Sequence, residues 1–149
     1  MNTINTISII VAIIGAITGI IGMVISILGR NQEKYHIVYE FLNGMTNPEF
    51  IKAREMVYNQ KNNDVSVNDE NMAFVVNYFH QWGLLAKKGY LPLWVFNYGS
   101  GAGAIRLYEA AAIFIKKRRQ LHEDDTYAYG FEWLYYRLKR KKIEHAYSK

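Results

Sequence analysis

The sequence predicts an all-α protein in which one N-terminal transmembrane helix, residues 1–29, precedes a cytoplasmic bundle of four to five helices, residues 30–149. Three observations support this prediction. Residues 7–28 form an apolar run without a charged side chain, and the charges of the 149-residue chain begin at Arg30. Beyond that point, apolar side chains recur at helical spacing. Only two prolines interrupt the chain.

Composition excludes several classes of protein. Half of the residues are apolar and 21% are charged, which excludes a disordered tail, a collagen-like repeat and a low-complexity linker. The chain has no cysteine. Disulfide scaffolds, cysteine-ligated zinc or iron–sulfur sites and cysteine nucleophiles are therefore excluded.

The apolar run has the length of a membrane span. Its 22 residues contain three polar side chains, Ser8, Thr18 and Ser26. As a helix the run extends about 33 Å, against a hydrocarbon core of about 30 Å. A cleaved signal peptide is the main alternative, but residues 2–6 have no basic side chain and residues 26–30 make a poor cleavage site. A buried core helix of this length without any charge does not suit so small a domain. We expect an uncleaved signal anchor.

Basic residues near the span predict its orientation. Arg30 and Lys34 follow it, whereas no basic side chain precedes it. The positive-inside rule therefore places the N-terminus outside and the C-terminal domain in the cytoplasm of a single-pass cell-membrane protein.

Small residues in the span are spaced by four and three in alternation, which keeps them on one stripe of the helix. The alternative is that the pattern is accidental, because such residues are common in membrane helices. Small residues let two helices approach closely in lipid, so we expect a homo-oligomer formed through this helix–helix interface. The stripe consists of Ser8, Ala12, Gly15, Gly19, Gly22, Ser26 and Gly29.

The span is expected to continue as one helix through residues 32–42, because no proline or glycine lies between positions 30 and 44. Residues 46–49, TNPE, then combine a capping side chain, a proline and an acid, which is typical of a helix start. The apolar face of this second helix is formed by Phe50, Ala53, Val57 and Tyr58. Residues 61–64 are expected to form a polar loop.

A third helix is predicted to begin between residues 66 and 70 and to stop at Gly89, with Met72, Val75, Val76 and Phe79 on its buried side. A short segment opens at residues 91–92 and contributes Trp94, Val95 and Phe96. Glycines at positions 99, 101 and 103 predict a bend that lets two helices approach. A long helix follows, with Ile105, Tyr108, Ala112 and Ile115 on one face, and ends in the basic residues 116–119.

Residues 127–135 fit two structures. Aromatic side chains alternate along them as in a strand, but Phe131, Leu134 and Leu138 also fit a helix. Acids precede this stretch and basic residues follow it, which favours a helix. We therefore predict a final helix here.

Four segments carry a resemblance to a known family: TNPEFIKAREMVYNQ (46–60), NYFHQWGLLAKKGYL (77–91), GAIRLYEAAAIFIKKRR (103–119) and YGFEWLYYRLKR (129–140). In this order, after a lone apolar helix, they resemble a bacterial family of small single-pass membrane proteins of unknown function. The resemblance covers most of residues 30–142. It implies an all-helical cytoplasmic domain and supplies no catalytic residues.

Candidate chemistry is sparse. The histidines at positions 36, 80, 122 and 145 lie on separate segments without metal-ligand spacing, and we expect His80 to be a packed helix residue. The glycines at 99, 101 and 103 match no phosphate-binding motif. We therefore expect no enzyme, no catalytic residue, no cofactor and no metal site.

Charge is divided unevenly between the two halves of the domain. Residues 30–86 have a net charge of −2, whereas residues 87–149 have +7. The cations of the second half form two clusters that we expect to face anions: Lys116, Lys117, Arg118, Arg119, Lys139, Arg140, Lys141 and Lys142. The alternatives are that they bind nucleic acid or form solvated helix ends.

These observations favour a non-enzymatic, self-associating interaction or regulatory module at the inner face of the membrane. Its expected partners are the lipid bilayer, a second copy of the chain, an unidentified protein and anionic lipid. The first alternative is a membrane-tethered nucleic-acid-binding module. The second is a pore-forming or lytic protein, against which the absence of a polar, pore-lining face in the span argues.

Overall fold

A computed structural model describes residues 3–60, 69–97 and 100–141, without the side chains at 3–11, 30, 31 and 60. Over these residues the chain forms five α-helices and one 3-10 helix, with no strand, so the predicted all-α class is confirmed. The chain divides into two compact units, Met1–His36 and Ile37–Lys149.

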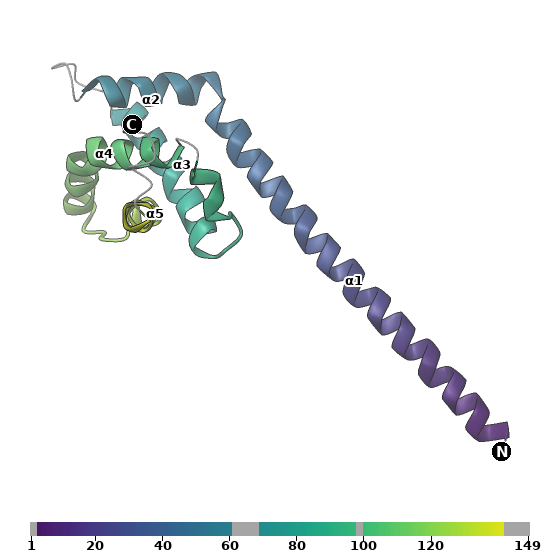
Figure 1. Cartoon of the computed structure of the whole chain (residues 1–149). Helices are drawn as coiled ribbons and strands as arrows, with labels where there is room; N and C mark the ends of the chain where they lie inside the picture. Colours follow the sequence, from purple (N-terminus) through teal and green to yellow (C-terminus); the bar gives the residue numbers. More distant parts are fainter. Residues whose placement is uncertain (1–2, 61–68, 98–99, 142–149) are drawn as a thin grey trace. The chain divides into compact units, whose positions relative to one another are not determined.

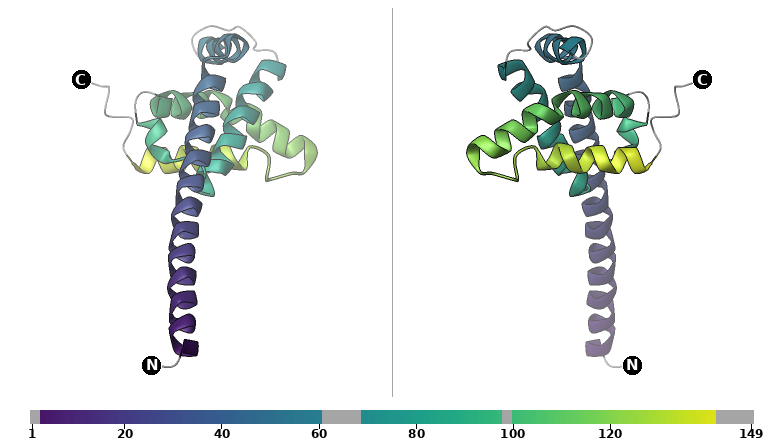
Figure 2. Two further views of the ribbon diagram at one scale, coloured as in Figure 1. Left: turned by 90° about the vertical axis from the view of Figure 1, so that its right-hand side faces the viewer. Right: turned by 90° about the vertical axis from the view of Figure 1, so that its left-hand side faces the viewer.

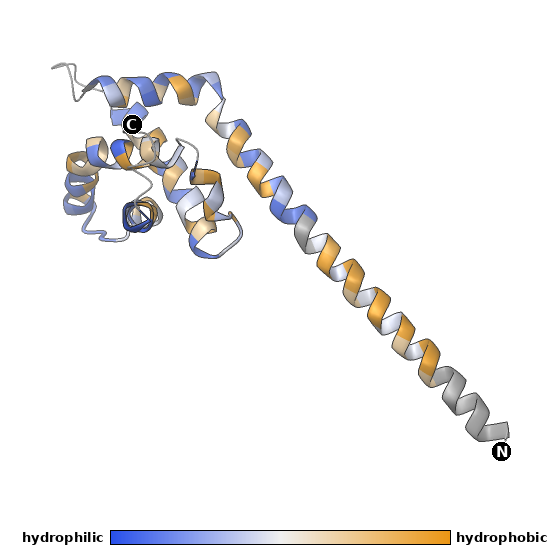
Figure 3. Cartoon of the chain, in the orientation of Figure 1, coloured by the Kyte–Doolittle hydropathy of each residue, from blue (hydrophilic) through white to orange (hydrophobic). Residues whose placement is uncertain are grey.

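Helix α1 runs without interruption over Thr3–Met45 (Figure 1). The predicted continuation of the apolar run into residues 32–42 is therefore confirmed. Every side chain from Ala12 to Gly29 is exposed, and the apolar colour in Figure 3 marks this stretch. Among the described residues, α1 contains the one stretch long and apolar enough to cross a membrane, a criterion of length and composition that signal sequences also meet.

The second unit is a helical bundle with an aromatic core. After the end of α1 it contains α2 (Pro48–Gln60), α3 (Asp69–Lys87), the 3-10 helix η1 (Leu93–Phe96), α4 (Ser100–His122) and α5 (Tyr129–Arg140). Five phenylalanines from five elements are at most 1% exposed, and each of them contacts a further aromatic ring. These are Phe41, Phe50, Phe79, Phe96 and Phe131.

Helix α2 begins as predicted. The Asn47 side-chain oxygen accepts a hydrogen bond from the Glu49 backbone N–H at 2.8 Å, which satisfies one of the free donors at the start of the helix. Three of its four predicted apolar residues are buried and Tyr58 is half-buried. The predicted loop at 61–64 and the exact start of the third helix lie outside the described residues.

Helices α3 and α5 touch backbone to backbone. A Cβ atom on Gly83 would lie 2.0 Å from the Gly130 carbonyl oxygen, and one on Gly130 would lie 2.1 Å from the His80 carbonyl oxygen. Beside this contact the rings of Phe79 and Phe131 stack with their centroids 4.8 Å apart. The two glycines therefore set how closely α5 lies against α3.

Several predicted details are wrong. Ala112 is exposed, because Ile105, Tyr108 and Ile115 share their face of α4 with Ala111 instead. The long helix continues past residue 119 to His122.

The predicted glycine bend is also corrected. Gly101 and Gly103 lie inside the first turn of α4, and Gly99 is outside the described residues. Gly103 does allow two helices to approach, because the Tyr58 hydroxyl of α2 donates a hydrogen bond to its carbonyl oxygen at 3.0 Å. A Cβ at this position would lie 3.0 Å from the same hydroxyl oxygen.

Candidate functional site

No described residue covers the predicted small-residue stripe of α1 where its side chains are described. A Cβ atom added at Gly15, Gly19, Gly22 or Gly29 would meet nothing within 4 Å. Ala12 and Ser26 are exposed as well, and the side chain of Ser8 lies outside the described residues. The stripe therefore remains a prediction whose surface is available to another molecule.

The basic clusters lie on two antiparallel helices (Figure 2). Arg119 of α4 contacts Glu132 near the start of α5, whereas Glu109 of α4 contacts Lys139 near its end. These two contacts are ten residues apart on α4, or about 15 Å along its axis. The antiparallel arrangement therefore separates the two clusters instead of joining them.

Three of the eight predicted anion-facing cations already have a carboxylate partner. Arg118 pairs with Asp69 at 3.5 Å, Arg119 with Glu132 at 2.8 Å and Lys139 with Glu109 at 3.1 Å. The remaining described cations of the set are exposed: Lys116, Lys117, Arg140 and Lys141. Lys142 lies outside the described residues. Whether these side chains bind an anion stays a prediction.

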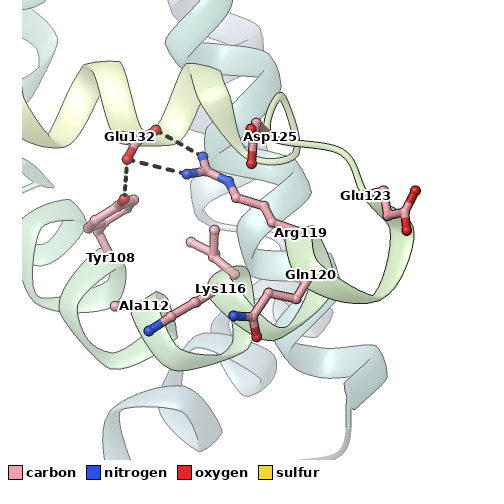
Figure 4. Close-up of a pocket in the computed structure, with 9 residues that line it drawn as sticks. Tyr108, Ala112, Lys116, Arg119, Gln120, Glu123, Asp125 and Glu132 are labelled. Carbon is pink, nitrogen blue, oxygen red and sulfur yellow. Dashed lines mark hydrogen bonds and ion pairs between the residues drawn. The ribbon is translucent and has the colours of Figure 1, made fainter.

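A pocket of about 650 Å³ lies between the second half of α4, the turn after it and α5 (Figure 4). The carboxylate of Glu132 occupies one wall. It accepts hydrogen bonds from the Tyr108 hydroxyl at 3.2 Å and from the Arg119 guanidinium at 2.8 Å. The Arg119 Nε–H donates a further hydrogen bond to the Tyr127 carbonyl oxygen at 2.9 Å.

Electrostatics in this pocket favour the ion pair. Hydrogen bonding to Glu132 raises the pKa of Arg119, so the guanidinium stays charged. Burial and the neighbouring Glu132 carboxylate raise the pKa of Tyr108, so its hydroxyl stays protonated and acts as a donor. The three polar groups satisfy one another and fix α5 on α4. This arrangement is that of a structural ion pair.

His80 is a half-buried residue of α3 that also makes a hydrogen bond to α5, which its sequence position did not indicate. Its Nδ1 atom accepts a hydrogen bond from the Gly130 backbone N–H at 3.2 Å, at the start of α5. Burial lowers the pKa of His80, which favours the neutral ring that this acceptor role requires. In the described part of the chain no three histidine or acidic side chains converge as metal ligands would. His145 lies outside that part.

Sequence reasoning missed the residues that join α3, α4 and α5. Isolated glycines inside helical patterns, such as Gly83 and Gly130, signal a close packing contact, and that signal was available. The pairing of Arg119 with Glu132 had no local signal, because the two residues are joined only by the turn between antiparallel helices.

Comparison with protein families identifies the chain. A family model described as Domain of unknown function (DUF4760) matches residues 2–138. The chain belongs to the DUF4760 family. The match spans both α1 and the helical bundle, so the DUF4760 domain includes the apolar helix. Comparisons with curated proteins and with solved structures found no match.

Proposed function

We propose that this DUF4760 protein is a single-pass bacterial membrane protein without enzymatic activity. Its N-terminal helix anchors it and associates with a second copy. The helical bundle faces the cytoplasm as an interaction or regulatory module. One observation carries the proposal more than any other: the uniform exposure of an uncharged, aliphatic helix.

The exposed side chains of this helix are costly in water. Large aliphatic side chains between Ile13 and Leu28 are 47–67% exposed and surround the helix. Residues 7–28 contain thirteen Ile, Val and Leu side chains. Each of these residue types favours membrane insertion by about 0.3–0.6 kcal/mol at the centre of a span. A bilayer therefore stabilises this stretch, which the rest of the described chain leaves uncovered.

Polar groups of the helix also suit a lipid environment. The Thr18 hydroxyl donates a hydrogen bond to the Ile14 carbonyl oxygen at 2.7 Å, so it needs no water as a partner. In the interior of an α-helix the backbone N–H and C=O groups pair with one another. The span can therefore enter hydrocarbon without leaving this donor unsatisfied.

Self-association is supported by the open space beside the glycines. In lipid, helices associate through close van der Waals contact and not through the hydrophobic effect. Gly15 and Gly19 are four residues apart, and no described residue lies within 4 Å of a Cβ added to either of them. A second copy of the same helix would fill this space.

We propose the absence of enzymatic activity because polar side chains in the pocket between α4 and α5 are hydrogen-bonded to one another. Tyr108, Arg119 and Glu132, the hydrogen-bonded polar side chains in the pocket between α4 and α5, satisfy one another. The nucleic-acid alternative has less support, because three cations of the predicted set are paired with carboxylates and the two clusters lie at opposite ends of the helix pair.

The proposal is tested by fusing a reporter that is active only outside the cytoplasm after Lys149. We expect an intact, membrane-bound and silent fusion. A control variant reverses the charge bias by Asn2→Lys and Asn5→Lys together with Arg30→Gln and Lys34→Gln, and it should become active. Strong activity of the unaltered fusion would overturn the orientation. Release of the chain from membranes by alkaline extraction would overturn the anchor.

A further inference from the structure

We propose that the outer face of α4 docks on a bilayer that contains anionic lipid. We call this surface the α4 outer face; it consists of Ile113, Lys116, Lys117, Gln120 and Leu121. The inference rests on the proposed membrane anchoring and adds a second, reversible contact to it. It assigns the predicted anion-binding role to one of the two basic clusters.

The geometry of α4 places these five residues together. They occupy positions i, i+3, i+4, i+7 and i+8, which form one stripe of an α-helix. All five are exposed. Ile113 is 83% exposed and Leu121 is 67% exposed, more than any other large aliphatic side chain in the described part of the bundle. The stripe therefore exposes apolar surface at both ends.

Two unpaired cations lie between the apolar side chains. Arg118 and Arg119, the next residues along α4, pair with carboxylates of the bundle. Lys116 and Lys117 are exposed and make no ion pair with the described residues. The charge that α4 presents outward is therefore positive and available.

Acidic side chains lie at one edge of the stripe, where Glu123 and Asp125 line the pocket between α4 and α5 together with Lys116 and Gln120. Lys117 does not line this pocket. Glu109, one turn before Ile113, pairs with Lys139 of α5. Asp124 follows the helix and accepts hydrogen bonds from the backbone and hydroxyl of Thr126. Between residues 110 and 122 the helix has no acidic side chain.

This combination fits an anionic membrane surface better than a nucleic acid. The phosphates of a nucleic acid can pair with the two lysines, but they would leave Ile113 and Leu121 exposed to water. At a bilayer the aliphatic side chains enter the boundary between headgroups and acyl chains, while the long lysine stems carry their charges to lipid phosphates. The tether favours this contact further. Because the bundle is covalently joined to the proposed anchor, it is held at high effective concentration near the membrane.

The test uses the full chain, whose lack of cysteine allows labelling at a single introduced site. Gln120→Cys, on the α4 outer face, is labelled with an environment-sensitive fluorophore, and Asn77→Cys on the exposed side of α3 is the matched control. Each protein is reconstituted into vesicles of phosphatidylcholine with or without phosphatidylglycerol. Flotation in a density gradient first establishes that the chain is anchored.

In anionic vesicles only, we expect the fluorescence emission of the label at position 120 to shift to shorter wavelength. We also expect lipid-attached quenchers to quench this emission. The shift should decrease severalfold at high salt and in a Lys116→Gln, Lys117→Gln variant. Arg140→Gln with Lys141→Gln removes the same charge from the other cluster and should leave the shift unchanged. The label at position 77 should remain water-exposed throughout.

Two results in chains that float would overturn the inference while the anchor stands: a label at position 120 that remains water-exposed, or an equal emission shift in neutral vesicles. An emission shift in detergent that grows with protein concentration would also overturn it, because a second copy of the chain would then cover the α4 outer face. Failure to float would instead overturn the proposed anchoring, and this inference with it.

Discussion

Glycines in the two units of this protein lie in opposite surroundings. In α1, a Cβ atom added to Gly15, Gly19 or Gly22 would have no atom of the described residues within 4 Å. In the bundle, an added Cβ on Gly83 or Gly130 would lie within 2.1 Å of a backbone oxygen on the facing helix. Both sets permit close helix approach, but among the described residues the bundle glycines contact a facing helix and the α1 glycines do not. The difference teaches that the same residue type supports folding in one unit and is available for association in the other.

The largest effect is expected from Gly83→Ala. Its Cβ would collide with the backbone of α5, and a backbone oxygen cannot move aside as a side chain does. Separating α3 from α5 opens the core around Phe79 and Phe131, so we expect a loss of about 3 kcal/mol in the free energy of unfolding. Chemical denaturation of the full chain in detergent, followed by near-ultraviolet circular dichroism, measures it. Gly15→Ala is the control and should leave the bundle's stability unchanged. Equal stability of both variants would contradict the described α3–α5 contact.

A smaller loss of stability is expected when the ion pair between α4 and α5 loses its carboxylate. Glu132→Gln leaves the Arg119 guanidinium, whose side chain is 20% exposed, without its carboxylate, and should cost about 1.5 kcal/mol. Glu109→Gln is the matched control. Its partner Lys139 is 46% exposed and returns to water, so the change should be a few tenths of a kcal/mol. The same denaturation experiment compares the two, and the reverse order would show that the pocket ion pair does not fix α5.

The smallest expected loss of stability occurs at mildly acidic pH, where His80 becomes protonated. Because burial lowers the pKa of His80 in the folded protein, the unfolded chain binds the proton more readily. Stability should therefore be full above about pH 6.5, the usual histidine pKa, and decline as the pH falls below it. Protonation of Nδ1 removes the acceptor for the Gly130 N–H, a loss of about 1 kcal/mol. Thermal melts at neutral and mildly acidic pH should show a smaller decline in His80→Gln, and an identical decline would contradict this role.

Local signals predicted much of the fold. The continuous helix through residues 32–42, the helix start at residues 46–49 and the buried face of α3 depend on neighbours within a few positions, where sequence patterns are informative. The final helix followed from flanking charges in the same way. Local patterns were less accurate for Ala112, which was predicted to lie on the apolar face of α4. On this long helix the buried residue is its neighbour Ala111, and Ala112 is exposed.

Contacts between segments that lie far apart in the chain could not be predicted from local sequence patterns. The hydrogen bond from Gly130 to His80 joins residues 50 positions apart, and the pair of Lys139 with Glu109 spans 30. Both depend on which helices lie together and in which direction. The predicted basic surface was divided for this reason, because antiparallel packing of α4 and α5 placed its two clusters apart and paired three of its cations.

Association of the isolated span in a membrane two-hybrid assay tests the central claim most directly. Gly19→Ile adds bulk in the middle of the uncovered stripe while keeping the helix apolar, so insertion should persist and association should weaken about tenfold, or about 1.4 kcal/mol. Ile17→Leu lies on the opposite face and keeps its bulk, so it should associate like the unaltered span. Equal association of the Gly19→Ile and Ile17→Leu spans would contradict the claim that the uncovered glycines of α1 are a contact with a second copy.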